Sequence, residues 1–112
     1  MVVYDNEELK QLILNNPNLP IVFFAGENCG SFFYWTHCSS VNCVLGEVLD
    51  CEQDIDKEKI YCDRDEFKSD VEDFLYYETE GCSTEEYNHR LENELKKYEP
   101  YWKSCILVYV DN

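Results

Sequence analysis

The stretch DRDEFKSDVEDFLYYETE, residues 63–80, decides the fold because it joins an apolar stripe to clear helix boundaries. Asp63 and Glu66 have the spacing of a capping box, and Gly81 can supply the left-handed residue that ends a helix. At 100° per residue one side of this segment is apolar and consists of Phe67, Val71, Phe74 and Leu75. The sequence therefore predicts an amphipathic helix packed on a core.

The opposite side of this helix carries carboxylates. It presents Asp65, Glu66, Glu72, Asp73 and Glu80, with Tyr76 among them. Arg64 and Lys68 lie beside the apolar stripe and dilute the negative charge little. Such a face is either a solvated surface or a binding surface for a cationic partner.

The net charge of −15 comes from 24 Asp and Glu against 9 Lys and Arg, in a chain of 112 residues that is 45% hydrophobic. This length and composition predict one folded domain over residues 1–112. The negative charge disfavours direct binding to nucleic acid or anionic membranes and favours basic partners. No signal peptide and no membrane span are expected, which favours a cytoplasmic chain with reduced cysteines.

The remaining elements are expected on both sides of this helix. A first helix is predicted over residues 5–16, capped by Asp5, and a third over residues 83–98, with a capping box at Ser83 and Glu86. Pro20–Ala25 is apolar on both faces, as in a strand covered on both sides. The other strands are predicted at residues 32–38, 41–51, 59–62 and 104–110, with a possible bulge at Gly46.

These elements predict the α+β class, in the order αββββααβ. The expected architecture is a mixed or antiparallel sheet of four to five strands packed by about three helices. The last strand, Ser104–Val110, is apolar throughout, so we expect it at the centre of the sheet or covered by a partner.

The seven cysteines and two histidines do not form a metal motif. Cys38 and Cys43 are the closest cysteine pair, and their spacing fits a turn between strands better than a zinc site. His37 is expected to be buried in the sheet and His89 to be solvated. The acids from Asp50 to Asp56 alternate but lack the glycine and final glutamate of an EF-hand. No metal and no cofactor are expected.

No catalytic residue is predicted either. Pro20–Gly30 superficially resembles the thioredoxin strand that delivers a reactive cysteine, but Cys29 has no partner in a C-x-x-C motif. The carboxylates lie on predicted outer faces and loops, whereas a catalytic acid usually needs an apolar pocket. The sequence favours a binding protein over an enzyme.

The best remaining candidate site is a broad acidic surface. Its residues are Asp65, Glu66, Glu72, Asp73 and Tyr76 on the central helix, with Asp50, Glu52, Asp54 and Asp56 as a second patch. Carboxylates three to seven residues apart on a helix are roughly 4.5–10 Å apart. Phosphates along one DNA strand advance by ~3.4 Å. Such a helix therefore presents a line of negative charge, comparable with that of the phosphates, to a basic groove.

In size, acidity and absence of catalytic motifs, the whole chain resembles small anti-defence proteins of phages and mobile elements, anti-CRISPR proteins in particular. The resemblance implies an inhibitor, acting in the host cytoplasm, that occupies the basic nucleic-acid or PAM-reading surface of a CRISPR-Cas effector nuclease. It assigns no role to individual residues. The chain would be a monomer or a weak homodimer.

Two alternatives belong to other classes of protein. The first is an assembly module that pairs with itself or a partner through its aromatic sheet, at Phe32–Cys38 or Ser104–Val110. The second is a thiol or metal enzyme, which would require a bound metal or a depressed pKa at Cys29.

Overall fold

A computed structural model describes residues 6–27, 29 and 37–111, which gather into two compact units. The first unit contains residues 6–27, 29, 37–47 and 104–111, and the second is Val48–Lys103. The fold belongs to the α+β class, as predicted. The expectation of one domain over residues 1–112 stays a prediction.

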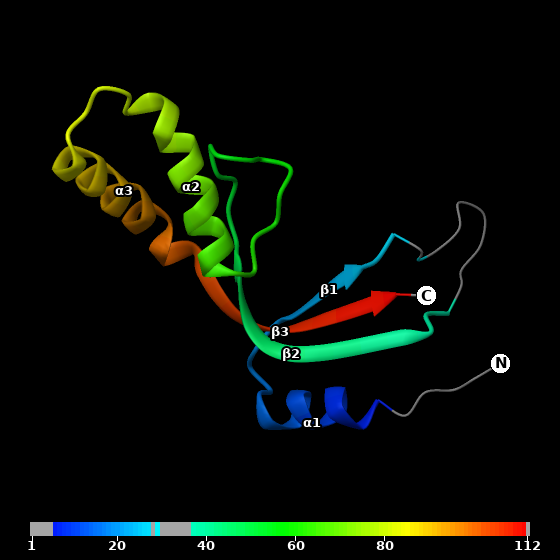
Figure 1. The fold of residues 1–112 in the computed structure, drawn as a ribbon. Coiled ribbons are helices and arrows are strands. Elements are labelled where there is room, and N and C mark those ends of the chain that lie inside the picture. The colour runs from blue at the N-terminus through cyan, green and yellow to red at the C-terminus, as the bar shows by residue number, and fades with distance from the viewer. Residues whose placement is uncertain (1–5, 28, 30–36, 112) are drawn as a thin grey trace. The chain divides into compact units, whose positions relative to one another are not determined.

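The first unit contains a three-stranded mixed sheet, with the order β1-β3-β2 among the described residues (Figure 1). The strands are β1 (Ile21–Ala25), β2 (Ser40–Leu49) and β3 (Trp102–Asp111). The last two residues of β2 and the first two of β3 belong to the second unit. β1 and β3 run parallel, with Ile21 opposite Ile106 and Ala25 opposite Val110. One helix, α1 (Glu7–Asn15), precedes the sheet in the chain.

β3 is the central strand, which confirms the prediction from its apolar sequence. Residues 105–108 are all buried, so both faces of the strand are covered. Leu107 lies so close to Gly46 of β2 that an added Cβ at Gly46 would stand 2.6 Å from a Leu107 methyl carbon. Glycine at this position therefore allows the two strands to pack closely.

β1 corrects the prediction of a strand covered on both faces. Its residues alternate between exposed and half-buried, and Phe23 is 65% exposed. The reason is its position, because β1 lies at an edge of the described sheet and has β3 as its only described neighbour there. On its other face Phe24 stacks on Tyr109 of β3, with ring centroids 5.3 Å apart.

Helix α1 also begins differently from the prediction. Asn6, not Asp5, occupies the N-cap position, and its side chain makes no capping hydrogen bond. Asp5 lies outside the described residues. The helix buries no residue completely, which leaves its apolar side only partly covered.

The second unit is built from two helices that lie side by side (Figure 1). They are α2 (Arg64–Glu78) and α3 (Thr84–Tyr98), and the short 3-10 helix η1 (Glu99–Tyr101) follows. The aromatic ring of Phe67 packs edge-on against three others, with centroid distances of 5.0 Å to Tyr61, 5.3 Å to Tyr98 and 5.8 Å to Trp102. Phe67 is thus at the centre of this core.

The predicted boundaries of α2 are confirmed. Asp63 is the N-cap, and its carboxylate accepts hydrogen bonds from the amides of Asp65 and Glu66. Thr79 is the C-cap, and Gly81 has a φ of +86° just beyond it. The predicted stripe faces inward: Phe67, Val71 and Leu75 are buried and Phe74 is half-buried.

Helix α3 is confirmed as well. The Ser83 hydroxyl accepts the amide N–H of Glu86 at its start. Tyr98 is buried, and the other apolar residues on its side of the helix, Tyr87, Leu91 and Leu95, are half-buried. Within the described residues no helix has both the length and the apolar character needed to cross a membrane.

The strand predicted at residues 59–62 is wrong. This segment belongs to an irregular loop, in which Ile60 is exposed and the Tyr61 carbonyl accepts one ladder-like bond, from the Leu49 amide. A strand requires a continuous ladder of hydrogen bonds, and residues 59–62 form none with another strand in the described part of the chain. The predicted order αββββααβ and sheet of four to five strands are therefore not confirmed.

The strands predicted at residues 32–38 and 41–51 can be compared with the structure only in part. Residues 32–36 lie outside the described part of the chain, whereas Ser40–Leu49 forms β2 nearly where a strand was expected. His37 is exposed and lies outside any strand, so the prediction that it is buried in the sheet is wrong. His89 is exposed, as expected.

Candidate acidic surface of helix α2

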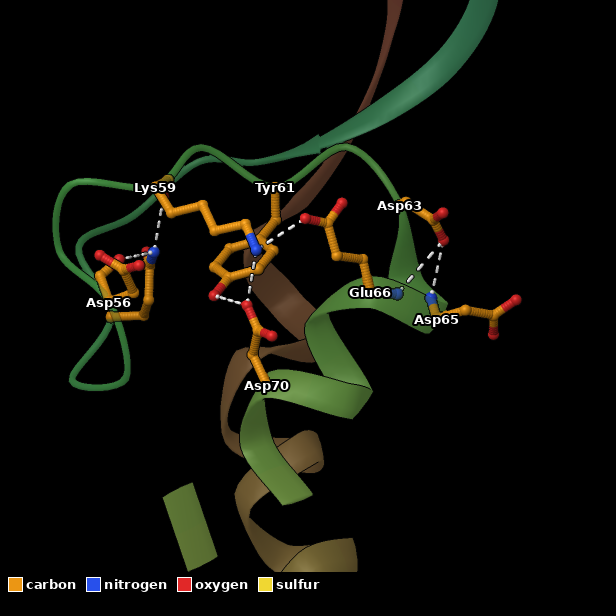
Figure 2. A network of polar contacts seen from close by, with 8 residues as sticks. Asp56, Lys59, Tyr61, Asp63, Asp65, Glu66 and Asp70 are labelled. Atoms are coloured by element: carbon orange, nitrogen blue, oxygen red, sulfur yellow. Dashed lines mark hydrogen bonds and ion pairs between the residues drawn. The ribbon is translucent and has the colours of Figure 1, made fainter. Parts of the chain in front are cut away.

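A polar network holds the loop of residues 50–63 against one flank of α2 (Figure 2). The Lys59 ammonium lies 2.7 Å from a Glu66 oxygen and 2.9 Å from an Asp70 oxygen. The Tyr61 hydroxyl donates to the same Asp70 oxygen at 2.6 Å. We call Glu66 and Asp70 the paired flank, because Lys59 compensates both carboxylates.

The ionisation of this network follows from its contacts. Hydrogen bonds from Tyr61 and then Lys59 lower the pKa of Asp70, so it stays ionised. Bonds to Glu66 and Asp70 raise the pKa of Lys59, which keeps its positive charge. Burial, followed by the bond to Asp70, raises the pKa of Tyr61, which stays protonated. At neutral pH the network therefore joins the Lys59 cation and the neutral Tyr61 donor to the ionised Asp70 carboxylate.

Gln53 organises the loop from within. Its side chain is buried, and its amide nitrogen donates to the backbone carbonyls of Asp56 at 2.6 Å and Lys59 at 2.8 Å. These bonds shape the turn that presents Lys59 to α2. Neither Gln53 nor Lys59 was predicted, since a polar loop residue and one lysine among nine basic residues give no local signal.

Three further carboxylates of α2 have no comparable compensation. Within the described residues, Asp65, Glu72 and Asp73 have no ion pair. Asp65 and Asp73 are exposed and Glu72 is half-buried. Figure 2 shows the Asp65 side chain pointing away from Lys59, although Glu66 beside it points toward Lys59. We call Asp65, Glu72 and Asp73 the open flank.

The structure thus divides the predicted helix site. Asp65, Glu72 and Tyr76 share one side of α2 at helical spacing, whereas Asp73 follows Glu66 by two turns and lies nearer to the loop. Tyr76 is 70% exposed and so is presented to solvent on the open side. The open flank is the part of the predicted site that keeps its negative charge uncompensated.

The predicted loop patch is divided too. Asp50, Glu52, Asp54 and Asp56 are all exposed. Asp54 pairs with Lys97 of α3 at 3.1 Å, and this contact raises the pKa of Lys97. Asp56 lies instead in a surface hollow that it shares with Asp73. The loop and the helix therefore meet in the hollow that Asp56 and Asp73 both line.

This shared hollow, the loop hollow, has a volume of about 560 Å³. It is lined by Ile55, Asp56, Lys59, Asp70, Asp73, Phe74, Tyr77 and Glu78. A second depression, the turn hollow, has a volume of about 570 Å³ and lies where α2 ends and α3 begins. It is lined by Tyr76, Tyr77, Thr79, Glu80, Gly81, Cys82, Ser83, Thr84 and Tyr87.

Tyr77 lines both hollows and is 82% exposed. Its ring packs edge-on against that of Tyr76, with centroids 5.4 Å apart. The sequence analysis did not include Tyr77 among the site residues. Its exposure could have been predicted from the helical periodicity. Phe74 and Leu75 occupy the apolar side of the last turn, so Tyr76 and Tyr77 must face solvent.

The cysteines show one contact that their spacing did not predict. The Cys29 and Cys38 sulfurs are 3.7 Å apart, and the Cys29 thiol also donates to the Val110 carbonyl at 3.4 Å. The hydrogen bond between the two thiols raises the pKa of Cys38, which makes that thiol a poorer nucleophile at neutral pH. Cys105 is buried, Cys82 is exposed, and the other five cysteines are half-buried.

Comparison of the chain with known protein families, with curated proteins and with solved structures finds no match. Among the described residues no group of three or more His, Cys, Asp or Glu side chains is arranged to hold a metal ion.

Proposed function

We propose that this chain is a non-enzymatic acidic protein that binds the basic nucleic-acid-binding surface of another protein and thereby inhibits it. The single observation that carries the proposal is the open flank of α2. Its three carboxylates are uncompensated within the described residues, although the same helix carries compensated ones a few residues away. The exposed Tyr76 belongs to the same side and offers a common type of interface anchor.

The spacing of these groups supports a phosphate-like role. Asp65 and Glu72 are two helical turns apart, or roughly 10 Å, and Tyr76 follows one turn later, at roughly 6 Å. Arginines and lysines that line a nucleic-acid channel are arranged to meet charges a few ångströms apart along a phosphate backbone. A rigid helix can present its carboxylates to such a channel without ordering a flexible segment.

The target in this proposal is a CRISPR-Cas effector nuclease, and the contacted surface is its nucleic-acid channel or PAM-reading site. Such surfaces depend on arginine and lysine side chains that recognise phosphates or guanine edges. The resemblance in size and acidity to anti-CRISPR proteins supports this choice.

The proposal assigns no catalytic role to the carboxylates. A general acid needs a raised pKa, and Asp70, which has the most extensive contacts, has a lowered one. The open-flank residues are in contact with solvent and not enclosed in an apolar pocket.

The test is inhibition and binding of guide-loaded Cas effector nucleases as the salt concentration rises from about 0.05 to 0.5 M. Over this range the screening length falls from ~14 to ~4 Å, so we expect a steep loss of affinity. An affinity that does not change with salt concentration would contradict the proposal.

A matched pair of triple variants locates the surface. One variant carries Asp65→Asn, Glu72→Gln and Asp73→Asn, and the control carries Glu58→Gln, Glu85→Gln and Glu92→Gln. Both remove three exposed or half-exposed carboxylates and change the net charge equally. We expect the first to lose inhibition and the control to retain most of it. Equal losses would mean that overall charge matters and the open flank does not.

A second candidate function is self-assembly through the sheet. The exposed Phe23 on β1 favours it, since an apolar side chain on an edge strand can pair with a second copy. The predicted alternative at Ser104–Val110 is less suitable, because β3 is already central and residues 105–108 are buried. Light scattering on the wild type and on Phe23→Lys tests it: a dimer that the substitution dissociates would support assembly, and a wild-type monomer would contradict it.

A further inference from the structure

The end of α2 carries two tyrosines whose exposure the fold does not explain. Tyr76 and Tyr77 are 70% and 82% exposed, more than any other described aromatic side chain. The core of the second unit is already filled by Phe67, Leu75 and their neighbours, so neither ring is needed there. Two adjacent exposed rings leave a large apolar surface in water, which a partner could cover.

The surroundings of the rings are acidic. Asp73 precedes Tyr76 and Tyr77 by one helical turn, and Glu80 follows them by about one turn. Neither carboxylate has an ion pair within the described residues, and both line hollows that the rings also line. A cation that contacts a ring face therefore has a carboxylate within one turn of the helix.

Two cations of the chain itself lie near this corner, and both are already engaged. Lys59 lines the loop hollow but contacts Glu66 and Asp70. Arg90 of α3 donates to the Glu78 carbonyl at 3.4 Å and lies 3.4 Å from the Glu78 carboxylate. Neither is placed over the ring of Tyr76 or Tyr77, since the described cation–ring contacts involve Tyr61, Trp102 and Tyr98.

We propose that the Tyr76–Tyr77 corner is a receptor for arginine side chains of the basic partner, and that it selects arginine over lysine. The selection follows from chemistry: a planar guanidinium can stack on an aromatic ring while it donates two hydrogen bonds to a carboxylate. An ammonium ion is more strongly hydrated and cannot make the same flat contact. The turn hollow and the loop hollow give a long side chain space on either side of Tyr77.

This inference rests on the proposed function and adds a specific residue preference to it. A purely electrostatic surface would bind arginine and lysine peptides of equal length and charge about equally. An aromatic receptor adds a cation–π contribution at exposed rings, which corresponds to roughly two- to fivefold in affinity per ring.

The experiment measures the affinity of the full chain for fluorescein-labelled octa-arginine and octa-lysine by fluorescence anisotropy at one fixed low salt concentration. We expect octa-arginine to bind roughly five- to tenfold more tightly than octa-lysine. The variant Tyr76→Leu/Tyr77→Leu should lose this preference and keep its affinity for octa-lysine. The variant Tyr76→Phe/Tyr77→Phe should keep the preference, since it retains both rings.

Tyr101→Leu is the matched control, because Tyr101 is exposed but lies in η1, in a different hollow. It should leave both affinities unchanged. Circular dichroism and thermal unfolding confirm that each variant is folded, which is expected because Tyr76 and Tyr77 are largely exposed.

The possible failures are distinguishable. Equal binding of the two peptides by the wild type would overturn the arginine receptor and leave the proposed function standing. A preference for arginine that persists in the leucine variant would also overturn it, because the rings would then not be its source. Binding of neither peptide would contradict both proposals.

Discussion

The two flanks of α2 carry the same kind of side chain and differ in what the rest of the chain places beside them. Glu66 and Asp70 meet Lys59, which the loop of residues 50–63 brings within 3 Å of both carboxylates. Asp65, Glu72 and Asp73 meet no such group among the described residues. Asp65 and Glu66 are adjacent on the helix, yet Glu66 forms an ion pair that stabilises the fold and Asp65 remains available for binding.

The largest effect on stability is expected from a substitution in the core on which α2 packs. Phe67→Ala deletes the ring that packs against Tyr61, Tyr98 and Trp102, so we expect a loss of about 3–5 kcal/mol in the free energy of unfolding. Urea denaturation followed by circular dichroism measures it. The control Tyr77→Ala should change stability by less than about 0.5 kcal/mol, because that ring is largely exposed. A Phe67→Ala loss below about 1 kcal/mol would contradict this description of the core.

The second prediction compares one residue from each flank. Asp70→Ala leaves the buried Tyr61 hydroxyl and Lys59 without their shared acceptor, and we expect a loss of about 2 kcal/mol. Asp73→Ala removes no described ion pair and should change stability by no more than about 0.5 kcal/mol. Both substitutions place alanine in the same helix, so its intrinsic helix preference cancels from the difference. Equal stabilities for the two variants would remove the distinction between the flanks.

A smaller effect is expected from lowering the pH, which should reduce the contribution of Asp70 to stability. The folded pKa of Asp70 is lowered, so its contribution to stability is fully present above the unfolded pKa of about 3.9 and is lost as the pH falls through the folded pKa. The stability difference between wild type and Asp70→Ala should therefore narrow as the pH falls from 6 toward 2. Denaturant unfolding at several pH values measures this narrowing. A difference that stays constant over this range would show that Asp70 does not act through its charge.

The smallest effect comes from giving the open flank a cation. Ser69 is exposed and lies four residues after Asp65 and four before Asp73, so Ser69→Lys places an ammonium between the two carboxylates. Relative to Ser69→Gln, we expect a gain of about 0.5 kcal/mol in stability that disappears in high salt. The same change should weaken binding to the Cas effector. Unchanged binding would indicate that the open flank is not the contact surface.

Local features were predictable from the sequence. The caps at Asp63 and Ser83 and the inward stripes of α2 and α3 depend on residues within a few positions of one another. The central place of β3 followed from its continuous apolar run, which only a strand covered on both faces can accommodate.

The errors occurred where a long-range neighbour decides the outcome. Pro20–Ala25 is as apolar as the last strand, yet Phe23 is exposed because β1 lies at an edge of the described sheet. Residues 59–62 have the composition of a strand but join no sheet among the described residues and remain a loop. His37 lies outside the sheet that was expected to bury it.

The sequence alone determined that α2 begins after Asp63, ends near Gly81, and turns its apolar side inward and its acidic side outward. Helix periodicity and capping are local, so these properties follow from consecutive residues. Only the tertiary structure decided which carboxylates remain open. Lys59 is 11 positions from Asp70 and Lys97 is 43 positions from Asp54, so the path of the loop and the packing of α3 determine these pairs. Coulomb interactions depend on distance in space, and sequence spacing fixes that distance only within a helix.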